Sequence, residues 1–154
     1  MTERRMGGAS SRARTVARKL AMQALYQWQL NPLVWQDLCL QFRDDEDMGR
    51  ADLEYFHELV RGVLEHSSAI DAELALSLDR LPQSLDPIEH AILLIGGYEL
   101  MHRPDVAFRV VITEAVGLAK RFGATGGQKY VNAVLDKTAR HVRSQEIDGS
   151  AAAV

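Results

Sequence analysis

The sequence lacks the features that mark disulfide-bonded, membrane-spanning and zinc-binding chains. Its one cysteine, Cys39, cannot form an internal disulfide, and no cysteine–histidine pair near it has zinc-site spacing. No run of about eighteen apolar residues could cross a membrane, and the N-terminus lacks the apolar segment of a secretory signal. We therefore expect a cytoplasmic protein in which Cys39 is buried as a small apolar side chain.

Charge is distributed unevenly along this chain of 154 residues. Residues 1–36 carry six basic side chains and one acidic, residues 37–114 carry six basic and seventeen acidic, and residues 115–154 carry six basic and three acidic. Two basic ends thus bracket an acidic middle, although the net charge is only −3. If the ends meet in space, they form a positive patch that attracts polyphosphate. The alternative is a scatter of charge that keeps the protein in solution.

Apolar residues recur at helical spacing along most of the chain, which predicts an all-α protein of about six or seven helices. The first runs from about Ser10 to Leu30. A short second helix is expected over Leu33–Arg43, before the acidic turn DDEDMG. A third pattern extends from Ala51 to Leu78, with a kink or restart at Ser67-Ser68.

The clearest helix start in the sequence is Asp86-Pro87-Ile88-Glu89. Asp86 suits the N-cap, Pro87 the first helical position, and Glu89 a position from which a carboxylate reaches back. The helix that follows, to about Met101, is apolar around most of its circumference, which predicts the central buried element. Gly96-Gly97 within it predicts close packing against another helix.

Two further helices are predicted, over about Ala107–Phe122 and Gly127–Arg143. Gly123, just after the first of them, is expected to adopt the left-handed conformation of a C-terminal cap. In the last helix several polar residues are expected to project away from the apolar face; they are Lys129, Asn132, Asp136, Arg140 and Arg143.

One domain is predicted, over residues 11–143. Residues 1–10 precede it and are expected to form a flexible basic arm. Residues 144–154 are small and polar, and are expected to be disordered.

Catalytic motifs are incomplete in this sequence. The stretch KRFGATGGQKYVNAVLDK approaches the phosphate-binding P-loop pattern, but Gln128 replaces a required glycine and Tyr130 replaces the Ser or Thr. His57-Glu58 begins a zinc-protease pattern, but Arg61 occupies the position of its second histidine. We therefore predict no enzyme, no cofactor and no metal site.

The polar face of the first predicted helix carries a basic stripe that ends in an aromatic ring. Its members follow one another at spacings of three or four residues: Arg12, Thr15, Lys19, Gln23 and Tyr26. Proteins that bind single-stranded RNA use cations for the phosphates and flat rings for unstacked bases. The alternative is that Tyr26 lies at the edge of the core and the cations are merely solvated.

The start of the last predicted helix repeats this combination of cation and ring with Lys129 and Tyr130. Gly126-Gly127 precedes them, and backbone N–H groups at a helix N-terminus are expected there to be open to a phosphate oxygen.

Three segments of the sequence resemble the NusB family of bacterial transcription antitermination factors. They are SRARTVARKLAMQALYQWQL, the apolar helix that ends in GGYEL, and ITEAVGLAKRFGATGGQKYVNAVLDKTAR. The resemblance spans about Ser11 to His141. It implies a fold of two packed three-helix bundles and a role without catalysis. That role is binding the boxA element of nascent ribosomal RNA jointly with the ribosomal protein NusE, within the antitermination complex of RNA polymerase.

The resemblance also implies site residues. The family's RNA surface corresponds here to Arg12, Arg14, Arg18, Tyr26, Lys129 and Tyr130. With the spacing argument, the full set of expected RNA-binding residues is Arg12, Arg14, Arg18, Lys19, Gln23, Tyr26, Gly127, Lys129 and Tyr130. Glu89 matches a position at which the family contacts NusE.

The chain departs from the family pattern in two places. Thr125, Gly126 and Gly127 stand where relatives often carry acidic or serine residues, which removes negative charge near the RNA. Tyr130 stands where phenylalanine is common. Two other functions stay open: a helical adaptor that binds only protein, and a detached domain related to the N-terminal part of RNA cytosine methyltransferases. The sequence also leaves open whether the protein forms a homodimer.

Overall fold

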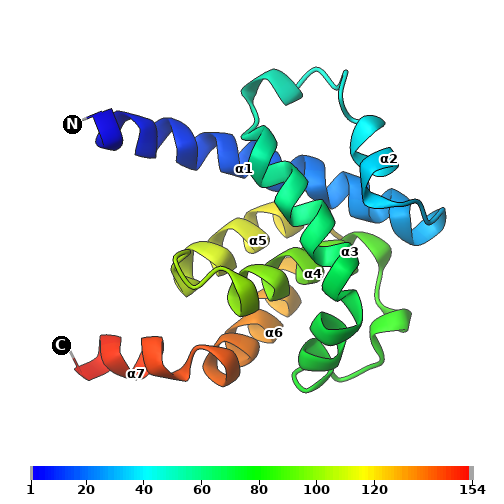
Figure 1. Ribbon diagram of the computed structural model, residues 1–154. Helices are drawn as coiled ribbons and strands as arrows, with labels where there is room; N and C mark the ends of the chain where they lie inside the picture. The colour runs from blue at the N-terminus through cyan, green and yellow to red at the C-terminus, as the bar shows by residue number, and fades with distance from the viewer. Residues whose placement is uncertain (1, 153–154) are drawn as a thin grey trace. The chain divides into compact units, whose positions relative to one another are not determined.

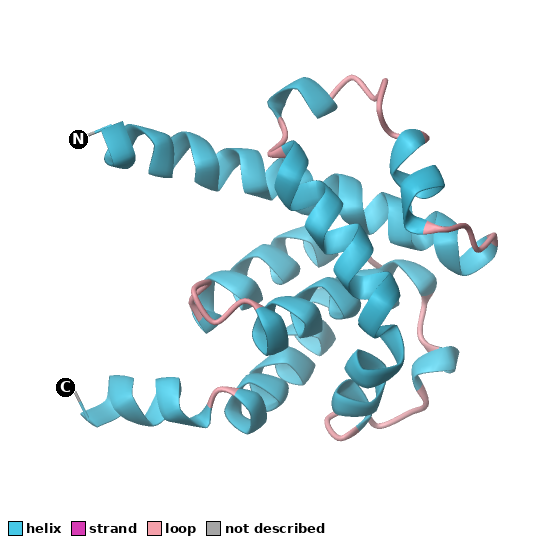
Figure 2. Ribbon diagram, in the orientation of Figure 1, coloured by secondary structure: helices cyan, strands magenta, loops and turns pink. Residues whose placement is uncertain are grey.

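The computed structural model describes residues 2–152, with side chains described for residues 11–148. Within residues 2–152 the chain forms helices and loops, with no strand (Figure 2). The all-α prediction is confirmed. The elements are α1 (Thr2–Leu30), α2 (Trp35–Leu40), η1 (Met48–Arg50), α3 (Leu53–Ala75), η2 (Pro82–Ser84), α4 (Pro87–His102), α5 (Phe108–Phe122), α6 (Gly127–Val142) and α7 (Ser144–Ala152).

The chain divides into two compact units, residues 1–65 and residues 66–154. The first contains α1, α2, η1 and the N-terminal part of α3 (Figure 1). Its core forms because α1 places apolar residues on one face at helical spacing. Those that are fully buried in α1 are Ala17, Leu20, Ala21, Ala24 and Leu25.

The second unit is built around α4, which packs with α5 and α6 (Figure 1). All ten residues of α4 from Ala91 to Leu100 are buried, as the apolar circumference of this helix predicts. Asp86 is the N-cap: its Oδ2 accepts hydrogen bonds from the N–H groups of Ile88 and Glu89, each at 3.1 Å. The predicted helix start is confirmed, because the cap satisfies two N–H groups that the helix cannot.

The glycine pair of α4 lies at two close helix contacts. A Cβ added at Gly96 would lie 2.8 Å from Cδ1 of Leu135 in α6, and one added at Gly97 would lie 2.7 Å from Cγ2 of Ile70 in α3. Both separations are shorter than van der Waals contact allows, so only glycine fits without movement of a neighbour. The predicted close packing is confirmed.

Arg143, the residue that ends α6, is buried against the C-terminal end of α4. Its guanidinium donates to the backbone carbonyl oxygens of Glu99, Leu100, Arg103 and Val106, at 2.7–2.9 Å. The expectation that Arg143 projects away from the apolar face is wrong. The last turn of a helix leaves carbonyl groups without helical partners, and this guanidinium supplies donors for them.

Other local predictions differ from the structure at single positions. Helix α3 runs through Ser67-Ser68 without a break. Gly123 is extended, at φ −83° and ψ 175°, and the left-handed residue is Gly126, at φ 81°. Glycine is required at 123 for another reason, since an added Cβ would lie 2.7 Å from the carbonyl oxygen of Ala119.

Both ends of the described chain are helical. Helix α1 begins at Thr2, where composition predicts a flexible arm over residues 1–10, and α7 begins at Ser144, where composition predicts disorder over residues 144–154. Glu146 holds the start of α7, because its carboxylate accepts from Arg143 at 2.6 Å and from the N–H of Phe108 at 3.2 Å. Residues 1, 153 and 154 lie outside the described residues. None of the helices in the described chain has the length and apolarity needed to span a bilayer.

Substitution of the α4 glycine should reveal the close packing. We expect Gly97→Ala to lower the free energy of unfolding by about 1–2 kcal/mol, since overpacking against Ile70 outweighs the gain in helix propensity. Gly117→Ala is the matched control: Gly117 lies inside α5 with nothing within 4 Å of an added Cβ. It should raise the free energy of unfolding by up to about 1 kcal/mol. Urea unfolding measures both, and equal stabilisation would contradict the packing argument.

Loss of the Arg143 guanidinium should be among the most damaging single changes. We expect Arg143→Met to lower the free energy of unfolding by roughly 3–5 kcal/mol, because four backbone carbonyls and the Glu146 carboxylate lose the hydrogen bonds that the buried guanidinium donates. Arg140→Met, on the same helix, removes an exposed pair with Asp136 and should cost less than about 0.5 kcal/mol. Thermal or urea unfolding measures both losses. Equal losses of stability in the two variants would show that Arg143 does not stabilise the end of α4.

Candidate nucleic-acid interface

The basic residues expected along α1 differ widely in their surroundings. Arg12 is exposed and Arg14 is partly buried, while Arg18 is only 4% exposed. The guanidinium groups of Arg14 and Arg18 lie over the ring of Tyr55, 4.4 and 5.4 Å from its centroid. Tyr55, which the sequence did not indicate, therefore binds two of the predicted RNA-binding cations within the first unit through cation–π contacts.

Lys19 is paired inside the protein. Its ammonium forms an ion pair with Asp47, which also pairs with Arg50, and the side chains of Lys19 and Asp47 are only 13% and 18% exposed. Hydrogen bonds from Lys19 and then Arg50 hold the pKa of Asp47 below its usual range. The acidic turn DDEDMG thus lies against α1 at this point.

A second contact holds the same connection to α1. The N–H of Asp52 donates to the carbonyl oxygen of Ala13 at 3.0 Å, and Arg14 lies 3.9 Å from the Asp52 carboxylate. Acids that follow α2 therefore neutralise part of the basic stripe. Sequence spacing assigned Lys19 to the stripe and the family resemblance added Arg14, but neither could show which residues cover these cations.

Tyr26 presents its ring at the surface of the first unit, with 36% of the residue exposed. Gln23 is partly buried one turn earlier. Arg12 and Tyr26 lie fourteen positions apart on α1, a separation of about 21 Å along the helix axis. In this unit the exposed cation and the exposed ring of the predicted stripe are therefore well separated from each other.

The start of α6 brings Lys129 and Tyr130 together in the second unit. Lys129 is exposed, and Tyr130 is partly buried. The hydroxyl of Tyr130 donates to Oδ1 of Asp79 at 3.0 Å, and the guanidinium of Arg80 lies 4.8 Å from its ring centroid. Partial burial and the bond to Asp79 raise the pKa of Tyr130. The hydroxyl is therefore held as a neutral donor.

Gly127 does not provide the open phosphate site that the sequence predicts. It is buried, and a Cβ added there would collide with the carboxylate of Glu89 from α4. Its own N–H donates to the carbonyl oxygen of Ala124 at 2.9 Å. A carboxylate of the protein thus lies at the positive end of α6, where a helix favours negative charge, and the prediction of an open backbone site at Gly127 is wrong.

Tyr26 and Tyr130 belong to different units. The hypothesis that the opening and closing helices form one continuous RNA surface therefore stays a prediction. Each unit by itself carries an exposed cation and an accessible ring: Arg12 with Tyr26 in the first, and Lys129 with Tyr130 in the second.

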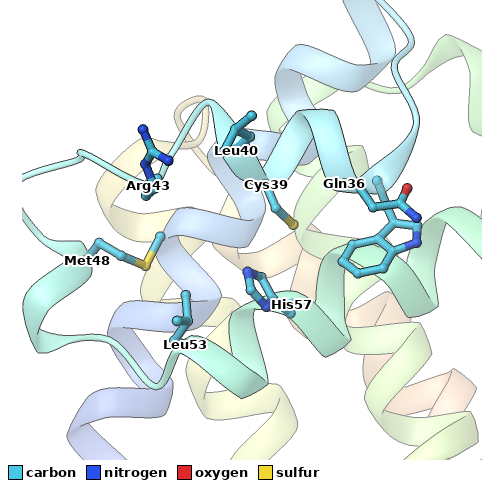
Figure 3. Close-up of a pocket in the computed structure, with 8 residues that line it drawn as sticks. Gln36, Cys39, Leu40, Arg43, Met48, Leu53 and His57 are labelled. Atoms are coloured by element: carbon cyan, nitrogen blue, oxygen red, sulfur yellow. The ribbon is translucent and has the colours of Figure 1, made fainter.

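The first unit also contains an apolar pocket of about 400 Å³ beside α2, lined by Trp35, Gln36, Cys39, Leu40, Arg43, Met48, Leu53 and His57 (Figure 3). Burial raises the pKa of the Cys39 thiol to about 11, which leaves it protonated and unreactive near neutral pH. The expectation that Cys39 is a buried apolar residue is confirmed. Across the described residues, no group of three or more His, Cys, Asp or Glu side chains could hold a metal ion.

Two histidines link α3 to later helices of the second unit. His90 lies 2.7 Å from the carboxylate of Asp71, and His141 lies 2.6 Å from that of Glu73. Local sequence patterns could not reveal these pairs, because their members lie 19 and 68 positions apart. Their place between packed helices indicates a structural role.

Comparison with known proteins gives a consistent result. The model of the NusB family matches residues 15–140. The transcription antitermination protein NusB of Thiobacillus denitrificans is 46% identical over 136 residues, which cover 88% of this chain and 94% of that protein. The protein of the same name from Alcanivorax borkumensis is 48% identical over 134 residues, covering 87% and 89%.

Two solved structures share the fold. NusB of T. maritima has a TM-score of 0.73 at 27% identity, and the match covers 82% of this chain and 89% of that one. A crystal structure of the antitermination factors NusB and NusE in complex with double-stranded RNA gives a TM-score of 0.69 at 24% identity, covering 82% and 96%.

Proposed function

This chain belongs to the NusB family of transcription antitermination proteins, and from this premise we propose that it binds boxA-type single-stranded RNA of nascent ribosomal transcripts. A NusE-like ribosomal protein binds with it, within the antitermination complex of RNA polymerase. The observation that best supports RNA binding is the exposed Lys129 beside the ring of Tyr130 at the start of α6.

The chemistry of these groups suits an unpaired strand. A lysine or arginine neutralises phosphates of any sequence, while a tyrosine ring stacks on a base that is free of a partner strand, worth about 1–3 kcal/mol per base. Arg12 and Tyr26 supply the same combination on α1. Arg18 and Lys19 contribute mainly to the fold, because Tyr55 and Asp47 already bind them.

A role without catalysis follows from the same groups. The site consists of cations and rings, and partial burial, followed by the hydrogen bond to Asp79, raises the pKa of the Tyr130 hydroxyl and so makes it a weaker acid. Binding alone explains the use of these residues.

Glu89 is the proposed contact for the NusE-like protein. It is partly buried and lies against the start of α6, close in the chain to the N-cap of α4. The side chain proposed to bind the partner is thus in contact with the helix that carries Lys129 and Tyr130. A partner that engages Glu89 would therefore act directly on the RNA-binding end of α6.

Substitution of the two rings tests RNA binding. We expect Tyr26→Ala and Tyr130→Ala each to weaken binding of a boxA-like single strand by about 1–3 kcal/mol, while Tyr26→Phe retains the affinity because stacking needs only the ring. Fluorescence anisotropy from low to high salt measures this, with the same sequence as a duplex for comparison. Affinity should fall steeply with salt. Weak binding that changes neither with salt concentration nor with substitution of the two rings would favour a protein-binding adaptor.

The partner supplies a second test. If RNA and the NusE-like protein share one complex, each should raise the affinity for the other by the same factor, since coupling between two ligands is reciprocal. Titration of RNA with and without the partner, and of the partner with and without RNA, gives both factors. Glu89→Gln should weaken binding of the partner, and it should not weaken binding of RNA by the protein alone, because it removes a carboxylate at the start of α6. Independent binding of the two ligands would contradict a shared complex.

A further inference from the structure

We propose that Arg80, in the connection between α3 and η2, is a further RNA-binding residue, and that it forms one nucleotide-binding site with Tyr130 and Lys129. The inference rests on the proposed RNA-binding function and adds a residue to it. All three side chains belong to the second unit, so the site does not depend on how the two units are arranged.

Arg80 reaches the RNA-binding end of α6 from a distant part of the chain. It lies 50 positions before Tyr130, yet its guanidinium carbon is 4.8 Å from the centroid of that ring. Half of its side chain is exposed, at 51%. A cation over an aromatic ring is attracted to the face of the ring, so this arginine is held next to the ring on which a base would stack.

Asp79 fixes both partners in position. One of its oxygens, Oδ1, accepts from the Tyr130 hydroxyl at 3.0 Å and from Nε of Arg80 at 2.8 Å, and Oδ2 accepts from Nη2 of Arg80 at 3.4 Å. The carboxylate engages one edge of the guanidinium. The remaining donors of the planar group can therefore bind a phosphate oxygen, which suits the forked geometry of arginine.

The pair with Asp79 does not cancel this role. The Asp79 side chain is 68% exposed, and exposed ion pairs are weak because water screens them. Lys129, the exposed residue that precedes Tyr130 in α6, supplies a second cation at this end of the helix. Two carboxylates lie near these cations, Asp79 and also Glu89, which lies against the start of α6. Arg80 is therefore expected to bind a phosphate through the directed donors of its guanidinium and not through a net positive charge.

The geometry also limits what Tyr130 can bind. Arg80 lies over one face of the ring, which leaves at most one face for a stacked base. The site is thus expected to take one unpaired base, with its backbone held by Arg80 and Lys129. A base in a duplex, whose faces are covered by its neighbours, does not fit this arrangement.

Arg109 provides a matched control for the test. It is also an exposed arginine of the second unit with its guanidinium over a ring, 5.7 Å from the centroid of Phe108. It lies at the N-terminal end of α5, whereas the loop into α6 follows the C-terminal end, about 22 Å away along the helix. Arg80→Ala and Arg109→Ala remove the same charge at different places.

The experiment compares binding of a boxA-like single strand by the full-length variants over a range of salt concentrations. We expect Arg80→Ala to bind roughly tenfold more weakly at low salt, with the slope of log affinity against log salt reduced by about 0.7. Arg109→Ala should match the unchanged protein. Arg80→Lys should recover the slope but only part of the affinity, because an ammonium lacks the planar fork. Circular dichroism and urea unfolding confirm that each variant is folded.

Two results would overturn the inference while the proposed function stands. In one, Arg80→Ala binds like Arg109→Ala while Lys129→Ala and Tyr130→Ala still weaken binding. In the other, Arg80→Ala and Arg109→Ala weaken binding equally, which would show an effect of net charge alone. Absence of salt-dependent RNA binding by the unchanged protein would instead overturn the proposed function, and this inference with it.

Discussion

The second unit depends on one constraint: α4 must be surrounded by other helices along its whole middle. Its residues from Ala91 to Leu100 are all buried, the charged Glu99 among them, so no face of this stretch is open to water. Two consequences follow. The helices around it can approach closely only where it has no side chain, at Gly96 and Gly97. The backbone groups at its two ends find hydrogen-bond partners within the protein. Asp86 accepts from N–H groups at the start of the helix, and Arg143 donates to carbonyl groups at its end.

The same need for partners within the protein reduces the number of basic side chains that are available at the surface. Six basic residues in the first 36 suggest a broad cationic surface, but several cations are already bound by other residues. Lys19 is paired with Asp47, Arg18 is buried beside Tyr55, and Arg143 binds carbonyls. The surface left for a nucleic acid is therefore smaller than the count of charges indicates. It consists of a few cations next to rings, which favours a short unpaired strand over extended contact with a duplex backbone.

The sequence predicted well what is local. Helical periodicity and the cap at Asp86 act over a few residues, so the helices and the buried α4 could be recognised in advance. It did not predict contacts between distant residues, such as Arg143 with α4, Asp47 with Lys19, or Asp79 and Arg80 with Tyr130. The glycine-rich loop shows the same limit: the left-handed residue is Gly126 and not Gly123. Glycines alone do not reveal which of them a turn requires for its backbone conformation and which for lack of space.

Tyr130 shows how contact with residues distant in the chain explains a local departure from the family pattern. The family resemblance expects phenylalanine here, and a ring alone is enough for stacking. A hydroxyl on a partly buried ring is stabilised by a hydrogen-bond acceptor, and Asp79 supplies one at 3.0 Å. The same carboxylate holds Arg80 over the ring. A ring that is fixed before binding loses less conformational entropy when a base stacks on it. The tyrosine, the aspartate and the arginine are therefore best understood as one arrangement, in which the extra hydroxyl orients the ring and the acid that binds it also places a cation beside it.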